Sequence, residues 1–110
     1  MPQNEQFVLT LIKKTLSHEL TWHHADSYFA IPESENPELF SLLSRLDVFE
    51  NSGKCYFASH NRKSIFIFFY CDGIQVFLQK DPSSRLLQLK DVDRSSLYRL
   101  YNAILSCEKN

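Results

Sequence analysis

Glycine is scarce in this chain, which has only Gly53 and Gly73 among its 110 residues. Loops that cradle phosphate groups need several glycines at fixed spacing, and neither a G-x-G-x-x-G nor a Walker pattern occurs. The sequence therefore argues against a glycine-rich phosphate-binding loop.

Cysteine is also limited: there are three, an odd number, and no two of them form a C-x-x-C pattern. They are Cys55, Cys71 and Cys107. This number and spacing do not indicate a disulfide framework, and free thiols suit a reducing compartment. We therefore expect a cytoplasmic protein without structural disulfides.

No hydrophobic run is long enough to cross a bilayer. The most apolar stretch, residues 64–80, is interrupted by Asp72 and Gly73, well short of the roughly 20 apolar residues that a spanning helix needs. The first residues, MPQNEQ, lack the basic and apolar regions of a signal peptide. We expect neither a membrane span nor a signal peptide.

What the chain does contain is typical of one globular domain, over residues 1–110. Apolar residues make up 44% of the sequence and charged residues 23%, so disorder is not expected. Residues 1–50 carry eight acidic and three basic side chains, whereas residues 51–110 carry five acidic and nine basic ones. This asymmetry indicates either a surface for a charged partner or ordinary solvated charge that interleaves in the folded chain.

Three segments have the periodicity of amphipathic helices. The first covers residues 8–16, with Asn4 as its predicted N-cap. The second begins at Asn36 and Pro37, a good N-cap and first helical residue, and the third follows Asp93. Each therefore has a start signal as well as an apolar stripe.

Between the helices, the pattern predicts strands. Alternation predicts one over residues 20–31, with a bulge or break near 25–27. Further strands are predicted at 55–59, 65–70, 74–79 and 86–89. The order α-β-α-β-β-β-β-α predicts an α+β fold, an antiparallel sheet of about four to five strands with helices mainly on one face. No motif residue assigns the chain to a family.

The strand predicted at 65–70, IFIFFY, is apolar on both faces and should be central in the sheet. We expect helices to cover one face and a partner or a long loop to cover the other. A fold this small cannot easily hide so much apolar surface on one side of a sheet.

The most chemically suggestive stretch is TWHHAD, residues 21–26. On a strand, His23 and His24 point to opposite faces and cannot bind one metal ion together, although His24 and Asp26 share a face. The other histidines and the cysteines lack the spacing of known zinc sites. No spacing specifies a cysteine–histidine–carboxylate set either. We therefore predict no metal, no cofactor and no enzyme activity.

Nucleic-acid binding is the alternative function. Basic residues beside an aromatic sheet can bind single strands, although a pI near 6.4 is well below the usual basic range. The predicted contact residues for this alternative are Lys54, Arg62, Lys63 and Arg85.

Protein recognition is the leading hypothesis, as in inhibitors, immunity proteins, adaptors and anti-defence proteins. An acidic loop would steer the protein to a basic surface of a larger partner, with aromatic anchors beside it. Self-association through apolar surface is the other form of this hypothesis. The predicted partner-binding residues are Asp26, Tyr28, Phe29, Glu33, Glu35, Glu38 and Phe40.

Overall fold

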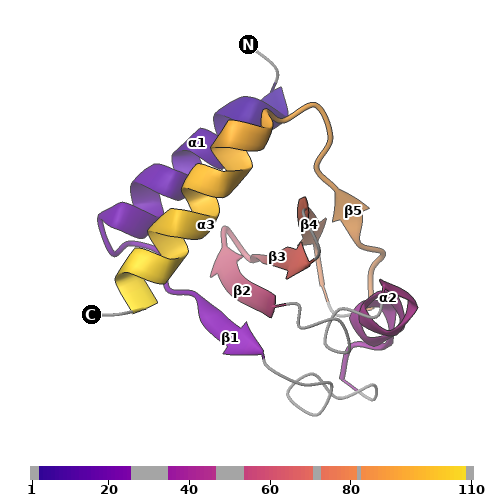
Figure 1. Cartoon of the computed structure of the whole chain (residues 1–110). Helices are drawn as coiled ribbons and strands as arrows, with labels where there is room; N and C mark the ends of the chain where they lie inside the picture. Colours follow the sequence, from indigo (N-terminus) through magenta and orange to yellow (C-terminus); the bar gives the residue numbers. More distant parts are fainter. Residues whose placement is uncertain (1–2, 26–34, 47–53, 71–72, 82, 109–110) are drawn as a thin grey trace.

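The computed structural model describes residues 3–25, 35–46, 54–70, 73–81 and 83–108. Their order is α-β-α-β-β-β-β-α, which confirms the predicted α+β fold with a five-stranded antiparallel sheet (Figure 1). The elements are α1 (Gln3–Leu16), β1 (His23–Ala25), α2 (Pro37–Leu46), β2 (Lys54–His60), β3 (Lys63–Tyr70), β4 (Gly73–Gln79), β5 (Leu87–Gln88) and α3 (Arg94–Glu108).

The sheet is a meander in which each strand pairs with its neighbours in sequence, in the order β1-β2-β3-β4-β5. The β2–β3 hairpin closes on the pair His60 and Lys63, which leaves a loop of two residues. These two, Asn61 and Arg62, have φ values of 51° and 66°, as a type I′ turn requires. The turn predicted at residues 60–63 is therefore confirmed.

One face of the sheet is covered by α1 and α3, which lie side by side (Figure 1). Alternate residues of β3, Ile65 and Ile67, point to this face and are buried. The helices supply their predicted apolar stripes to the same core: Val8, Leu11, Ile12, Leu100, Tyr101 and Ile104.

The opposite face of the sheet is covered by α2. Phe66 and Phe68 of β3 point to this side and pack in a second core. The other buried members of this core are Ala25, Leu39, Leu42, Leu43, Cys55 and Phe77. Two of the three described helices, α1 and α3, lie on one face, as predicted. Among the described residues, α2 covers the second face.

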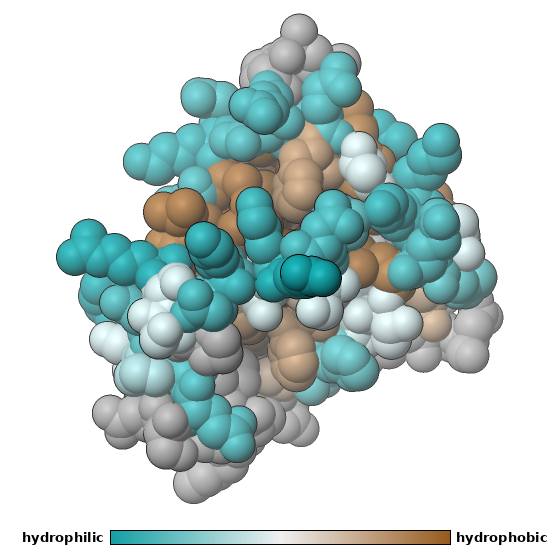
Figure 2. Space-filling view, turned by 180° about the vertical axis from the view of Figure 1, so that it is seen from behind, coloured by the Kyte–Doolittle hydropathy of each residue, from teal (hydrophilic) through white to brown (hydrophobic). Residues whose placement is uncertain are grey.

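Because both faces of β3 are covered, the expectation of surplus apolar surface is wrong for the described residues. Of their large hydrophobic side chains, the exposed ones are Leu16, with 56% of its surface accessible, and Leu87, with 66%. In Figure 2, hydrophobic surface is visible in patches between hydrophilic side chains. Excess apolar surface therefore does not support partner binding here.

Three local predictions differ from the structure. Helix α1 begins at Gln3, so Asn4 lies in its first turn and is not the N-cap; its amide donates to the carbonyl of Lys90 at 2.9 Å. Strand β1 begins at His23, later than predicted, and the bulge expected near 25–27 extends outside the described residues. Strand β5 is two residues long. No described helix has the length and hydropathy needed to cross a membrane.

A buried carboxylate joins α1 to α3. Glu5 accepts hydrogen bonds from the hydroxyl of Ser96 and from the backbone N–H of Asp93, the latter at 2.8 Å. These bonds place a negative charge at the N-terminus of α3, where the helix dipole favours it. The bond from Ser96 is the main cause that lowers the pKa of Glu5, followed by the bond from Asp93. The two helices are thus fixed at this end.

We expect this carboxylate to make stability depend on pH. A pKa that is lower in the folded state stabilises the fold above the unfolded pKa, and this contribution is lost as the pH falls through the folded value. Glu5→Gln should therefore lower the melting temperature at pH 7, and its difference from the wild type should shrink below about pH 4.

Thermal unfolding between neutral and acid pH tests this. Ser96→Ala should act through the same interaction. The melting temperature of the double variant should therefore fall by less than the sum of the two single decreases. A difference between wild type and Glu5→Gln that stays constant with pH would contradict the assignment.

Candidate functional site

Strand β1 forms one edge of the sheet, and no described strand pairs with its outer side. Hydrogen-bonded and non-hydrogen-bonded pairs alternate along antiparallel strands, and a two-residue hairpin closes on a hydrogen-bonded pair. His60 closes the hairpin with Lys63, so every second residue back along β2, Tyr56 included, directs its backbone N–H and C=O towards β3. Phe57 lies between these residues and directs its backbone groups towards β1. His24, the partner of Tyr56, therefore directs its backbone N–H and C=O to the open edge.

The two adjacent histidines lie on opposite faces of the sheet, as predicted. The ring of His23 packs against Phe57, with centroids 5.4 Å apart, and the ring of His24 packs against Tyr56 at 4.9 Å. Both side chains are exposed. Within the described part of the chain, no group of three or more histidine, cysteine or acidic residues is arranged to hold a metal ion.

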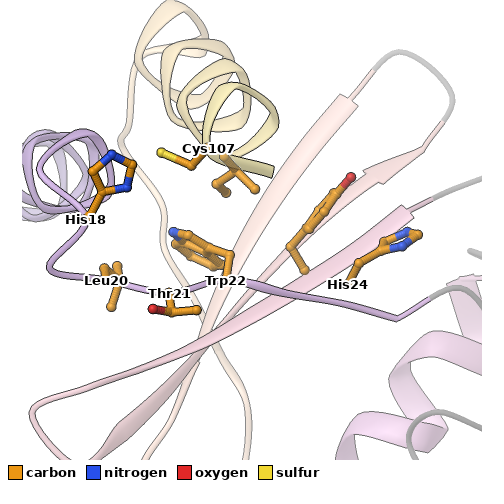
Figure 3. A pocket seen from close by; sticks show the side chains of 8 residues that line it. His18, Leu20, Thr21, Trp22, His24 and Cys107 are labelled. Atoms are coloured by element: carbon orange, nitrogen blue, oxygen red, sulfur yellow. The ribbon is translucent and has the colours of Figure 1, made fainter. Parts of the chain in front are cut away.

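A hollow of about 150 Å³ lies on the α1–α3 side of this edge (Figure 3). Its lining comes from the end of α1, the segment leading into β1, strand β2 and the end of α3. The lining residues are His18, Leu20, Thr21, Trp22, His24, Tyr56, Ile104 and Cys107. Aromatic and imidazole rings therefore surround a space large enough for one side chain.

The buried Thr15 holds the walls of this hollow in place. Its hydroxyl accepts a hydrogen bond from the indole N–H of Trp22 at 2.9 Å and donates to the carbonyl of Leu11 at 2.7 Å. Its own carbonyl accepts a bond from the thiol of Cys107 at 3.1 Å. Thr15 thus joins α1 both to the segment before β1 and to α3, and these bonds fix the shape of the hollow.

A second, more open hollow of about 480 Å³ lies on the other face of the same edge. None of its described lining residues belongs to α2, so that helix leaves this part of the sheet uncovered. The half-buried Phe57 supplies its aromatic surface. The described lining residues are Glu19, Thr21, His23, Phe57, Ala58, Ser59 and Ser64.

The start of α2 is fixed to the sheet by a pair of amides. Asn36 donates to Gln79 of β4 at 2.7 Å and accepts a bond from it at 3.0 Å. The same Asn36 oxygen caps α2 by accepting the backbone N–H of Leu39 at 3.2 Å. Gln79 is only 1% exposed and also donates to the carbonyl of Ser84. The predicted N-cap is thus confirmed, with a partner that the sequence did not indicate.

The predicted partner-binding residues are only partly described. Glu35 and Glu38 are exposed on either side of the fixed Asn36, so their carboxylates extend from a rigid helix start. Phe40 lies in α2 and is half-buried. The remaining predicted residues lie outside the described part of the chain: Asp26, Tyr28, Phe29 and Glu33.

The residues predicted for nucleic acid do not form one group. Arg62 and Lys63 are at the β2–β3 turn, and Arg85 precedes β5 at the same end of the sheet, because Leu78 pairs with Leu87. Lys54 begins β2, roughly 20 Å away along the strand at 3.3 Å per residue. The fold therefore separates Lys54 from the other three cations.

Cys55 is not suited to nucleophilic catalysis. Its side chain is fully buried in the α2 core, and desolvation raises the pKa of its thiol well above the ordinary value. The thiolate, which is the nucleophile, is therefore disfavoured. His24 lies on the other face of the sheet, so it cannot serve as a base for Cys55. Cys71 lies outside the described residues.

Sequence reasoning missed the contribution of Thr15, His18 and Cys107 to the first hollow. These residues are brought together only when the ends of α1 and α3 pack beside the segment before β1. The available signal was a threonine on the apolar stripe of the first helix, which indicates a buried hydroxyl needing a partner.

We expect the amide pair to be important for stability. Asn36→Ala removes the cap of α2 and leaves the buried Oε1 atom of Gln79 without its donor, so the free energy of unfolding should fall by about 2 kcal/mol. Ser41→Ala, at an exposed position of α2, is the matched control and should change it by less than about 0.5 kcal/mol. Urea unfolding measures both, and equal losses would contradict the assignment.

Comparison with known proteins assigns no family to the chain. No family model, curated protein or solved structure matches the chain. What the protein does is therefore inferred from its own residues.

Proposed function

We propose that this protein is a small non-enzymatic binding protein that takes an extended segment of a larger protein partner onto the open edge of β1. The observation that carries this proposal is the edge itself: the backbone of His24 faces outward, and a hollow lies on each face beside it. An edge of this kind is a template for one more strand.

Strand addition explains why the two hollows are useful together. Main-chain hydrogen bonds give affinity, and pockets for alternate side chains give specificity. Successive side chains of an added strand point to opposite faces. One would enter the hollow beside Trp22 and Tyr56, and the next would lie over Phe57 on the other face.

Charge would select the partner. The exposed Glu35 and Glu38 stand at the fixed start of α2. The sequence adds Asp26 and Glu33, which lie between β1 and α2 in the chain, as further acidic candidates. An acidic surface accelerates association with a basic partner by electrostatic attraction. The aromatic anchors proposed from the sequence are Tyr28, Phe29 and Phe40.

This mode of action fits an inhibitor, immunity protein, adaptor or anti-defence protein, each of which acts by occupying a surface of its target. The three cysteines without a disulfide pattern support a cytoplasmic location for the encounter. A second copy of the chain could use the same edge, and the experiments below separate that outcome from a different partner.

Two variants of one residue test the strand-addition mode. His24→Pro removes the outward N–H, and proline is tolerated at an edge where that N–H faces solvent. His24→Ala removes the imidazole and keeps the N–H. We expect His24→Pro to lose a partner that affinity capture from native cells recovers with the wild type, and His24→Ala to retain it.

Native mass spectrometry of the captured material distinguishes the occupants. A stoichiometric second protein supports the proposal, whereas a homodimer of the wild type that His24→Pro converts to a monomer assigns the edge to self-association. Equal retention by both variants would show that the edge is not the binding surface. Circular dichroism should confirm that both variants remain folded.

Charge reversal tests the acidic surface. Glu35→Lys together with Glu38→Lys should weaken binding to the captured partner and flatten the dependence of affinity on salt, because two attractive charges become repulsive. Both side chains are exposed, so the melting temperature should change little. Unchanged affinity at low salt would remove the acidic surface from the proposal while leaving the edge intact.

A further inference from the structure

Arg62 occupies a backbone conformation that its residue type does not favour. Four described non-glycine residues have positive φ: His18, Asn61, Arg62 and Asp91. Histidine, asparagine and aspartate are the types enriched in this region, and arginine is not. Glycine is preferred at the second position of a type I′ turn. Arg62 therefore stands where glycine would stabilise the turn, which makes its side chain a candidate for a functional contact.

A hollow of about 230 Å³ lies next to this turn, on the α1–α3 side of the sheet. It has an apolar floor, two aromatic rings, three side-chain amides and one lysine, and its described lining contains no carboxylate. The lining residues are Gln3, Asn4, Phe7, His60, Asn61, Lys63, Ile65, Leu78 and Leu89. Of the three hollows described, this one alone has a permanent positive charge in its described lining.

The two rings are held together at the mouth of the β2–β3 turn. Phe7 and His60 lie edge to face, with centroids 6.0 Å apart. Burial, and then the charge of Lys14, lowers the pKa of His60, which favours the neutral ring. The amide nitrogen of Asn61 lies 3.3 Å from the Nε2 atom of the same ring. The hollow therefore presents flat apolar surface beside amides and the ammonium group of Lys63.

We infer that this hollow binds one nucleotide unit of a single-stranded nucleic acid, with the base against Phe7 and His60 and the phosphate on Arg62 and Lys63. Bases stack on aromatic rings, and amides such as those of Gln3 and Asn61 bind their edges. A cavity of about 150 Å³ holds a benzene ring, so 230 Å³ accommodates a base. This inference goes beyond the proposed protein-binding function and does not depend on it.

The test is fluorescence anisotropy with a labelled DNA strand of about 12 nucleotides and an abasic strand of equal length. Titrations at about 50 and 200 mM salt give the salt dependence of binding. We expect the abasic strand to bind about tenfold more weakly, as for the loss of one stacked base. Unlabelled mononucleotide should compete only at much higher concentration than the unlabelled strand.

Three substitutions locate the phosphate contact. Arg62→Gly suits the positive φ of the turn, so it should keep or raise the melting temperature while lowering the slope of log affinity against log salt by about 1. Lys63→Gln should lower the slope similarly. Lys54→Gln makes the same change of charge at the opposite end of β2 and should leave affinity within about twofold of the wild type.

Four results would overturn the inference. Equal binding of the abasic strand would reduce the site to phosphate attraction without base recognition. Equal losses of affinity in Lys54→Gln and Arg62→Gly would show that the strand responds to the overall charge of the protein and not to a defined phosphate contact. Competition by mononucleotide at the concentration of the strand would assign the hollow to a free nucleotide. Absence of binding to the strand at low salt would exclude nucleic acid as the ligand. An acidic protein segment would then be the remaining candidate for the cations of the turn.

Discussion

The structure depends on one constraint, which is that β3 is apolar on both faces and must be kept from water on both. Ile65 and Ile67 are buried beneath α1 and α3, and Phe66 and Phe68 are buried beneath α2. A single layer of helices could satisfy only half of this requirement. Helix α2 lies between β1 and β2 in the sequence, so the chain can cross to the second face there while α1 and α3 remain on the first.

Two polar contacts hold this three-layer arrangement, and both use side chains far apart in sequence. Glu5 joins α1 to the start of α3, and Asn36 joins the start of α2 to Gln79 in β4. Each places an acceptor at the first turn of a helix, where backbone N–H groups lack partners. The polar groups at these two helix starts are thereby satisfied.

The open surfaces follow from the lengths of the elements. Helix α2 has ten residues and leaves the sheet uncovered beside Phe57, while β1 has an unpaired outer side among the described strands. At the β2–β3 turn, the hollow near Phe7 and His60 lies beside Arg62 and Lys63. The proposed protein-binding edge and the inferred nucleotide site are therefore separate places, with different residues and different chemistry.

The sequence by itself determined the helices, the central strand, the turn at Asn61 and the cap at Asn36, because these follow from periodicity and from side chains that act on their own backbone. It also determined that His23 and His24 face apart. Only the tertiary structure decided that α2 covers the second face and that Gln79 fixes Asn36. These depend on contacts between residues tens of positions apart, which no local pattern records. The same holds for the hollows, whose walls come from several elements.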